Sequence, residues 1–310
     1  MRGLLNPGTC CSVNSVLQCL RACWGPADID DLRSVVSVCS PTAAQAVAYN
    51  LFELLHVMDT GDDNAVASQH FGSPADPSQL VQQLSLRHGI PFAQRQEDAD
   101  TVLKNLLSAV KKCCRSVSHG KQAHKSLSWD IRTSIELSCC NCGDTTIVPE
   151  TPTSLTVLMN EENRVEDLQS YVDLYRSKFS RTTVVMRCQT CQLPECQCHH
   201  VTRIESLPDR LCVLVPKFTG AFDCPETLDA GPLQIQGAGA KLYDLTAVVM
   251  HVGDRYAGHF YAYVKRGGSW HVANDCHVTD VEWSTVRSRA RGDGSGATAG
   301  YLFMYCAKCK

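Results

Sequence analysis

The sequence predicts an α+β protein in which a helical part comes first and a strand-rich part follows. In the first 125 residues, apolar side chains recur at helical spacing, as at Val13, Val16 and Leu17. After residue 125, short runs of β-branched and aliphatic residues such as 131–137 and 247–252 predict strands. Two Cys-x-x-Cys pairs in the strand-rich part indicate that metal ligands organise one segment of it.

Four helices are expected in the helical part. The first begins near Cys11, after an Asn-Pro-Gly turn signal. The second covers 42–58 and ends before a polar run. Apolar residues within 80–86 predict the third helix. The fourth begins near Asp98 and ends on a pair of lysines, because acids are favoured at the start and bases at the end of a helix.

Bulk composition excludes several classes of protein. The 310 residues carry a formal net charge of −3 at pH 7, with 20% charged residues, so no basic surface for nucleic acid or an anionic membrane is expected. No apolar run approaches the roughly 18 residues of a membrane span, and the N-terminus lacks the features of a secretory signal. We therefore expect a soluble protein of the cytoplasm, with the nucleus as a further compartment, that binds no nucleic acid and inserts into no membrane.

The chain has 19 cysteines, a high count. Without a secretory signal, metal ligands, a reactive thiol and buried free thiols explain them better than disulfides do. Cys139, Cys142, Cys188 and Cys191 form two Cys-x-x-Cys pairs whose four thiolates match tetrahedral zinc. The alternative is a ribbon that has lost its metal and keeps these cysteines as core thiols. Side chains nearby that could supply a substitute ligand are Cys140, Cys196, Cys198, His199 and His200.

A reactive cysteine is expected at the start of the first helix. Free backbone amides and the helix dipole stabilise a negative sulfur there, which would lower the thiol pKa below its free value. Cys11 is the candidate nucleophile. Helix physics alone does not separate it from Cys10, and a small buried cysteine is the alternative.

The segment 3–18 resembles the cysteine box of the ubiquitin-specific proteases, which reads Gly-Leu-x-Asn-x-Gly-x-Thr-Cys-x-x-Asn-Ser-x-Leu-Gln. The residues that fit it in one register are Gly3, Leu4, Asn6, Gly8, Asn14, Ser15, Leu17 and Gln18. The resemblance implies that Cys11 is the nucleophile. It also implies that the side-chain amide of Asn6 stabilises the tetrahedral oxyanion. Because this box lies so near residue 1, we expect that a preceding segment is missing or short.

The segment 96–103 is similar to a second box of this family, Gln-Gln-Asp-Ala-x-Glu-Phe-Leu. In the family the Asp of this box binds an arginine in the C-terminal tail of the modifier, which implies the same role for Asp98 through a charge-assisted bond. Thr101 replaces the Glu of the box and removes one carboxylate contact. The alternative for Asp98 is an acidic residue that only stabilises a helix start.

The segment 258–265 resembles the histidine box of the family. The resemblance implies that His259 is the general base, which takes the proton of Cys11 and gives it to the leaving amine. Gly258 lets substrate backbone approach because it has no side chain, and we expect Gly258 and Tyr261 to contact the modifier tail. His251 is the alternative base, but it lacks this setting and is expected to be structural.

Residues 270–275 fit a fourth box, Trp-x-x-Phe-Asp-Asp, with Asn274 and Asp275 at its last two positions. We expect the neutral amide of Asn274 to orient the imidazole, as in cysteine proteases that use Cys-His-Asn. Asp275 is the accessory residue, which would add a hydrogen bond near the oxyanion or replace Asn274 as the orienting group. An acidic residue of a surface turn is the alternative.

The boxes follow the family's order, so the resemblance implies the papain-like fold of the ubiquitin-specific proteases. It implies a helical thumb at 1–125 with the nucleophile, zinc-ribbon fingers at 126–205, and a β-rich palm at 206–310 with the histidine and asparagine. The three regions form one catalytic domain, with catalysis in the cleft between thumb and palm.

The activity implied by the resemblance is hydrolysis of the isopeptide bond between a modifier and a target lysine. Within the family, the compact chain, the Thr-Cys-Cys-x-x-Asn-Ser wording and Asn274 before Asp275 most resemble a member that removes an interferon-induced modifier with two ubiquitin folds. The resemblance implies this modifier and its conjugates as partners, and type I interferon receptor signalling as the regulated process. The alternatives are a general deubiquitinase that binds ubiquitin and a non-catalytic adaptor.

Overall fold

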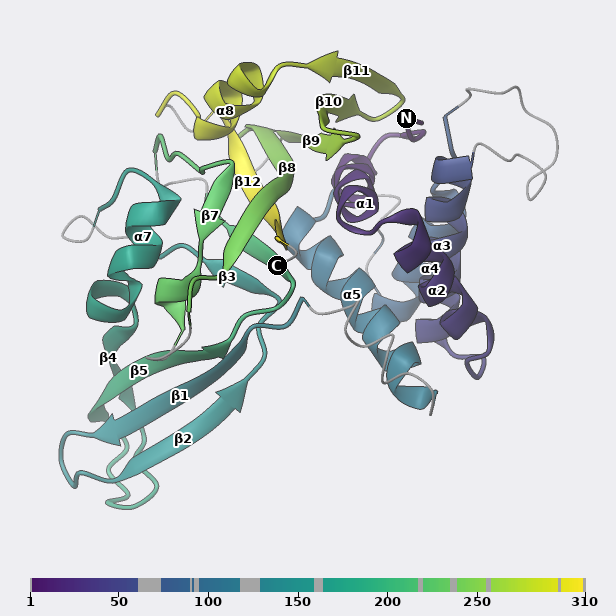
Figure 1. Ribbon diagram of the computed structural model, residues 1–310. Coiled ribbons are helices and arrows are strands. Elements are labelled where there is room, and N and C mark those ends of the chain that lie inside the picture. The colour runs from purple at the N-terminus through teal and green to yellow at the C-terminus, as the bar shows by residue number, and fades with distance from the viewer. Residues whose placement is uncertain are drawn as a thin grey trace.

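The computed structural model describes residues 2–60, 74–89, 91, 95–117, 129–158, 164–216, 220–234, 239–254, 258–294 and 297–308. The helices of the first 116 residues gather on one side of the molecule, and two β-sheets with the later helices occupy the other side (Figure 1). The predicted α+β class is therefore confirmed. The predicted boundary at residue 125 lies outside the described residues.

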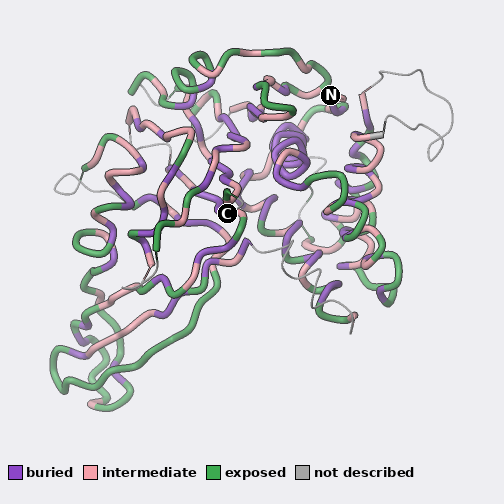
Figure 2. The backbone as a smooth tube through the Cα atoms, viewed as in Figure 1, coloured by how far each residue is buried: buried purple, intermediate pink, exposed green. Residues whose placement is uncertain are grey.

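The helical side contains α1 (Cys11–Cys23), α2 (Pro26–Ser37), α3 (Ala43–Thr60), α4 (Ser78–His88) and α5 (Ala99–Ser116). The four predicted helices correspond to α1, α3, α4 and α5, and α2 was not predicted as a separate helix. α1 is the most deeply buried, since every residue in it except Ala22 is buried (Figure 2). A helix that is buried on all sides has no free polar face, so its position is set by the elements around it.

The larger sheet has the strand order β11-β10-β9-β8-β12-β6-β3, and β7 also pairs with β8. Its pairs are antiparallel except β3 with β6. The strands are β3 (Ser154–Thr156), β6 (Arg210–Leu214), β7 (Thr227–Asp229), β8 (Leu242–Gly253), β9 (Gly258–Arg266), β10 (Ser269–Asn274), β11 (His277–Val281) and β12 (Thr298–Ala307). The helix α8 (Trp283–Arg291) packs against β12.

The smaller sheet is antiparallel and has the order β2-β1-β5-β4. Its strands are β1 (Arg132–Cys139), β2 (Thr145–Glu150), β4 (Arg181–Met186) and β5 (Cys196–Ser206). The sheet extends away from the rest of the molecule at the lower left of Figure 1. Between β3 and β4 the chain forms α7 (Leu168–Leu174) and a short π-helix, Tyr175–Phe179.

Two hydrophobic cores lie on opposite faces of the larger sheet. On β9, Phe260, Ala262 and Val264 belong to the core shared with α1 and the other helices, whereas Tyr263 belongs to the second core. Side chains alternate across a strand, so a strand between two cores is apolar on both faces. This double burial makes β9 a rigid support for the residues at its start. Among the described residues, no helix combines the length and apolarity that crossing a membrane requires.

The N-terminal segment is joined to the larger sheet by a close backbone contact at Gly3. A Cβ atom at this position would lie 2.3 Å from the carbonyl oxygen of Cys276. We expect Gly3→Ala to lower the free energy of unfolding by about 1–3 kcal/mol, because backbone must shift to admit the methyl group. Urea unfolding followed by circular dichroism measures this change. Gly239→Ala is the matched control, since a Cβ at Gly239 meets no atom within 4 Å. Equal stability of both variants would contradict the prediction.

Candidate active site

The sulfur of Cys11 lies at the start of α1, where this helix packs against β9. The preceding turn is held by Asn6, whose Oδ1 accepts hydrogen bonds from the backbone N–H groups of Gly8 and Cys10 at 2.9 and 3.0 Å. The side chain of Asn6 thus closes a turn in place of a backbone carbonyl, and α1 begins directly after this turn. A backbone hydrogen bond from Phe260 of β9 reaches the sulfur of Cys11. The nucleophile predicted at residue 11 therefore lies beside the residue that follows His259.

Burial raises the pKa of the Cys11 thiol above its ordinary value, because the side chain is desolvated. The residue is only 4% exposed. Backbone hydrogen bonds from Phe260 and from the helix start lower the pKa, while the nearby charge of Asp275 raises it. The predicted lowering of the thiol pKa is therefore wrong for the free protein. The helix-start effect exists, but desolvation outweighs it.

His259 and Asn274 form the hydrogen bond that the sequence predicted. His259 Nε2 lies 2.6 Å from Asn274 Oδ1, at the start of β9 and the end of β10. Because an amide oxygen only accepts, this bond places the ring hydrogen of neutral His259 on Nε2. Nδ1 is then the nitrogen that can take a proton. The half-buried ring remains accessible to a reacting group.

Asp275 joins the N-terminal segment to the sheet instead of holding the imidazole. Its carboxylate accepts from Asn6 Nδ2 at 2.9 Å and from Asn14 Nδ2 at 2.7 Å. Its backbone oxygen accepts from the N–H of Leu4 at 2.8 Å. These contacts favour the accessory role predicted for Asp275 over its alternatives as the orienting group or a surface turn acid. The nitrogen of Asn6 carries a second hydrogen, which an oxyanion could accept.

Gln96 is a site residue that the sequence analysis did not single out. Its Nε2 donates a hydrogen bond to the sulfur of Cys11 at 3.2 Å. The residue opens the second box of the predicted family, two positions before Asp98, so its place in that box was the signal that could have found it. A side-chain donor at this position stabilises negative charge on the sulfur.

Asp98 caps α5 in the free protein. Its Oδ1 accepts from the backbone N–H groups of Asp100 and Thr101 at 2.9 and 3.1 Å. Its Oδ2 accepts from the hydroxyl of Tyr301 at 2.6 Å. Asp98 therefore stabilises the start of α5, which was the alternative to a substrate-binding role. Binding of a tail arginine by Asp98 stays a prediction.

Gly258 is a glycine for a reason that involves His251. A Cβ atom at Gly258 would lie 2.3 Å from His251 Nε2, so the ring occupies the space that a side chain would need. The ring of His251 also packs on Phe260, with centroids 4.6 Å apart. Tyr261 is half-buried and packs edge-on against Tyr263, with centroids 5.5 Å apart. Contacts of Gly258 and Tyr261 with a substrate tail stay predictions.

The four predicted ligand cysteines meet at the tip of the smaller sheet. The sulfurs of Cys139, Cys142, Cys188 and Cys191 all lie within 4.8 Å of one another. The Cys142–Cys188 pair is 3.6 Å apart and the Cys139–Cys191 pair 4.0 Å. Zn–S bonds of about 2.3 Å in a tetrahedron separate the sulfurs by about 3.8 Å, so this cluster could bind zinc.

Backbone amides around the cluster favour thiolates, the form that binds a metal. Hydrogen bonds from the backbone of Cys142 and then Asn141 lower the pKa of Cys139 to about 6. A backbone hydrogen bond from Leu193 lowers the pKa of Cys191. At Cys142 a backbone hydrogen bond from Asp144 also lowers the pKa, but burial and the neighbouring thiols outweigh it and raise the pKa to about 12. Both knuckles thus supply backbone donors toward their own sulfur atoms, and the four cysteines present fit a zinc site.

The family model described as ubiquitin carboxyl-terminal hydrolase matches residues 2–305. The chain belongs to this family. The resemblance that the sequence motifs indicated is thereby confirmed at the level of the family.

Two relatives show how the chain compares with other ubiquitin carboxyl-terminal hydrolases. It is 25% identical over 304 residues to ubiquitin carboxyl-terminal hydrolase 17-like protein D of Mus musculus, which covers 92% of this chain and 52% of the mouse protein. It is 26% identical over 328 residues to ubiquitin carboxyl-terminal hydrolase 26 of Arabidopsis thaliana, which covers 94% of this chain and 28% of the plant protein. The chain thus spans about half the length of the mouse relative and less of the plant one.

The solved structures confirm the predicted fold of the ubiquitin-specific proteases. The SAGA DUB module bound to monoubiquitin contains a chain that superimposes with a TM-score of 0.74 at 15% identity, over all of this chain and 69% of that one. The same module bound to ubiquitin aldehyde gives a TM-score of 0.71 at 17% identity, over all of this chain and 70% of that one.

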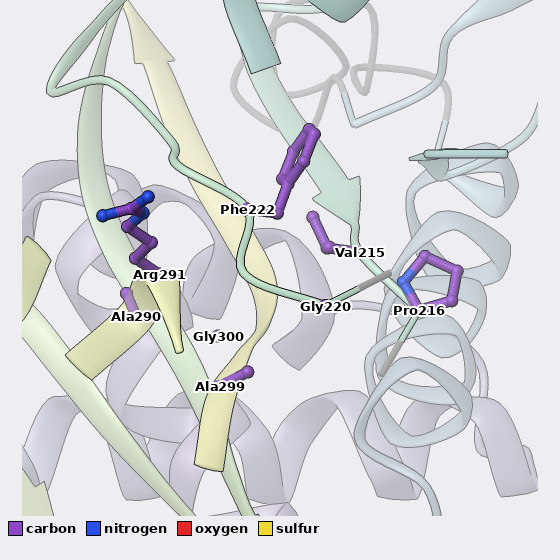
Figure 3. Close-up of a pocket in the computed structure, with 8 residues that line it drawn as sticks. All are labelled: Val215, Pro216, Gly220, Phe222, Ala290, Arg291, Ala299 and Gly300. Atoms are coloured by element: carbon purple, nitrogen blue, oxygen red, sulfur yellow. The ribbon is translucent and has the colours of Figure 1, made fainter. Parts of the chain in front are cut away.

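A small pocket of this hydrolase lies between the end of β6, β12 and α8 (Figure 3). Val215 and Phe222 form one wall, and Ala299 and Gly300 of β12 form another. Its lining includes none of the predicted site residues and no cysteine, histidine or carboxylate. The pocket therefore has no group for nucleophilic or acid–base chemistry, which depends on the residues around Cys11.

The raised pKa of Cys11 predicts how this hydrolase reacts with alkylating agents. A thiol with a pKa above the ordinary 9.0 has little thiolate at neutral pH, and its thiolate fraction keeps rising beyond that value. We expect alkylation of Cys11 by iodoacetamide to accelerate from about pH 7 to about pH 10 without a plateau. Short pulses followed by site-resolved mass spectrometry measure the rate. Cys276, which is exposed, is the control thiol, and a Cys11 plateau near neutral pH would contradict the prediction.

Proposed function

We propose that this chain is a thiol-dependent isopeptidase that removes a ubiquitin-like modifier from target lysines. The supporting observation is the arrangement around Cys11. Its sulfur receives hydrogen bonds from Gln96 and from the backbone of Phe260, the residue that follows His259 in the chain, and His259 is hydrogen-bonded to Asn274. A nucleophile and an oriented base on neighbouring elements are what covalent acyl transfer needs. Membership of the ubiquitin carboxyl-terminal hydrolase family supports the same reaction.

In the proposed mechanism, His259 Nδ1 takes the proton of the Cys11 thiol and the thiolate attacks the carbonyl of the modifier's C-terminal glycine. The oxyanion accepts hydrogen bonds from the backbone N–H of Cys11 and from the second hydrogen of Asn6 Nδ2. His259 then protonates the lysine amine as the C–N bond breaks, which leaves a thioester on Cys11. Water, deprotonated by His259, hydrolyses this thioester and restores the thiol. A single oxyanion donor contributes a factor of about 100–1,000 in rate.

The tail of the modifier is proposed to lie along Asp98, Gly258 and Tyr261. Oδ2 of Asp98 bonds Tyr301 while Oδ1 caps α5, and a carboxylate oxygen has a further lone pair for an arginine. Thr101 offers no second carboxylate, so this contact is made by one acidic group.

The proposed modifier is the interferon-induced one with two ubiquitin folds, and its removal would damp type I interferon signalling in the cytoplasm or nucleus. The chain resembles ubiquitin-specific protease 18, which removes this modifier, in three sequence features: the compact chain, the Thr-Cys-Cys-x-x-Asn-Ser motif, and Asn274 before Asp275. The alternative is ubiquitin itself. It is supported by the names of the relatives and by the solved DUB module, which is bound to monoubiquitin.

Activity-based probes that carry either modifier in front of a thiol-reactive group test both levels of the proposal. We expect the two-domain probe to label the protein faster than the ubiquitin probe. Faster labelling by ubiquitin would overturn the modifier and keep the isopeptidase. Labelling by neither probe would overturn the isopeptidase. Binding of a probe without labelling would favour a non-catalytic adaptor, a function that Thr101 in place of Glu also suggests.

Cys11→Ala and Cys10→Ala form a matched pair for the same assay. The two side chains are adjacent and both buried, at 4% and 1% exposure, so the substitutions disturb packing to a similar extent. We expect Cys11→Ala to lose probe labelling and to reduce turnover by about 1,000-fold or more, whereas Cys10→Ala keeps most of both. Inactivation by Cys10→Ala alone would show that the assignment of the nucleophile is wrong.

We further propose that the cysteine cluster binds one structural zinc ion. When bound, zinc would cross-link the two knuckles that carry Cys139, Cys142, Cys188 and Cys191. Elemental analysis of protein purified without chelator should give about one zinc per chain, and Cys142→Ala should lower this value and the melting temperature, because the apolar cluster there consists mainly of cysteines. Wild-type protein with almost no zinc would contradict the proposal.

A further inference from the structure

The tip of the smaller sheet contains more sulfur than a tetrahedral zinc site needs. Cys196, the first residue of β5, has its Sγ atom 3.6 Å from the Sγ of Cys191. This separation is as short as the 3.6 Å between Cys142 and Cys188, two members of the predicted ligand set. Cys196 is 4% exposed, so its thiol points into the cluster and not into solvent. A fifth sulfur therefore lies against one of the four predicted ligands, outside the group of four sulfurs that all lie within 4.8 Å of one another.

A tight loop between the second knuckle and β5 places this extra thiol. The loop reverses at Gln192, which has a φ of 57°, and the N–H of Cys188 bonds the carbonyl of Leu193 at 3.2 Å. The thiol of Cys196 lies 3.9 Å from the same carbonyl. This short loop connects Cys191 to Cys196 and places the thiol of Cys196 against the sulfur of Cys191.

The contacts of the extra thiol within the cluster are not symmetric. Cys196 lies against Cys191, which is half-buried, whereas Cys142 pairs with Cys188 on the other side of the cluster. Cys191 is also more accessible to solvent oxidants and alkylating agents than buried Cys196. Among the four predicted ligands Cys142 is exposed and Cys191 is half-buried, so Cys191 is one of the two that reagents in solution can reach.

We propose that Cys196 is a reserve ligand that replaces Cys191 at the zinc ion. The inference rests on the zinc site of the proposed function. When Cys191 is absent or blocked, the Cys196 thiol releases its proton to solvent and its thiolate forms the fourth Zn–S bond. One thiolate replaces another, so the site keeps four sulfur ligands and the same net charge. The finger tip then keeps its metal after loss of a single thiol.

Metal content of substituted proteins tests the proposal. We expect Cys191→Ala to keep about one zinc per chain, because Cys196 takes its place, whereas Cys142→Ala loses most of its zinc. The double variant Cys191→Ala/Cys196→Ala should lose zinc as Cys142→Ala does. Cys191→Ala/Cys198→Ala is the matched control, since Cys198 also lies in the cysteine cluster but has Cys139 as its cross-strand neighbour, and it should keep its zinc.

Cobalt substitution supplies a second readout that does not depend on activity. Cobalt in wild-type protein and in Cys191→Ala should show the same absorption of a four-thiolate site, and the double variant with Cys196→Ala should lose it. Zinc loss from Cys191→Ala alone, or zinc retained in that double variant, would overturn the role of Cys196. Wild-type protein without zinc would instead overturn the zinc site itself, so the two failures are distinguishable.

Discussion

The position of the Cys11 sulfur depends on the contact between Asp275 and the N-terminal segment. Asp275 binds Asn6 and Asn14 with its carboxylate and Leu4 with its backbone oxygen. On its other side, the segment forms backbone bonds with Ala75, so it is held between the helical part and the turn after β10. Charge-assisted bonds of this kind are stronger than bonds between neutral groups. They bring the start of α1 to β9, and with it the sulfur of Cys11.

Burial decides the chemical state of that sulfur. Helix-start amides favour the thiolate, but removal of water from around Cys11 favours the neutral thiol more strongly. A neutral thiol resists oxidation, which suits a chain with 19 cysteines. In the proposed reaction, the thiol is therefore activated by proton transfer to His259, whose tautomer is held by Asn274. Activation by a neighbouring base, and not by the helix dipole alone, is the consequence of this packing.

The smaller sheet is stabilised in a different way from the rest of the protein. Every residue of β2 is exposed, and the buried apolar cluster at the tip consists of cysteines, with Val184 and Cys191 packed against it. A sheet with so little apolar burial needs another source of stability. Four thiolates around zinc would stabilise the sheet, and a fifth thiol beside them would keep the zinc bound if one ligand were lost. The proposed zinc site therefore needs cysteines as thiolates, whereas burial keeps Cys11 as a neutral thiol.

Local patterns in the sequence determined most of the elements and the chemistry of the site. Helical spacing predicted α1, α3, α4 and α5, and the motifs singled out Cys11, His259, Asn274 and the four cluster cysteines, because these signals lie within short segments. The sequence missed the contact from Gln96 and predicted the opposite pKa shift for Cys11. Only the tertiary structure decided these points, since hydrogen bonds from distant segments and the degree of desolvation depend on how the elements pack. The same holds for Asp275, which binds Asn6 across 269 positions of the chain.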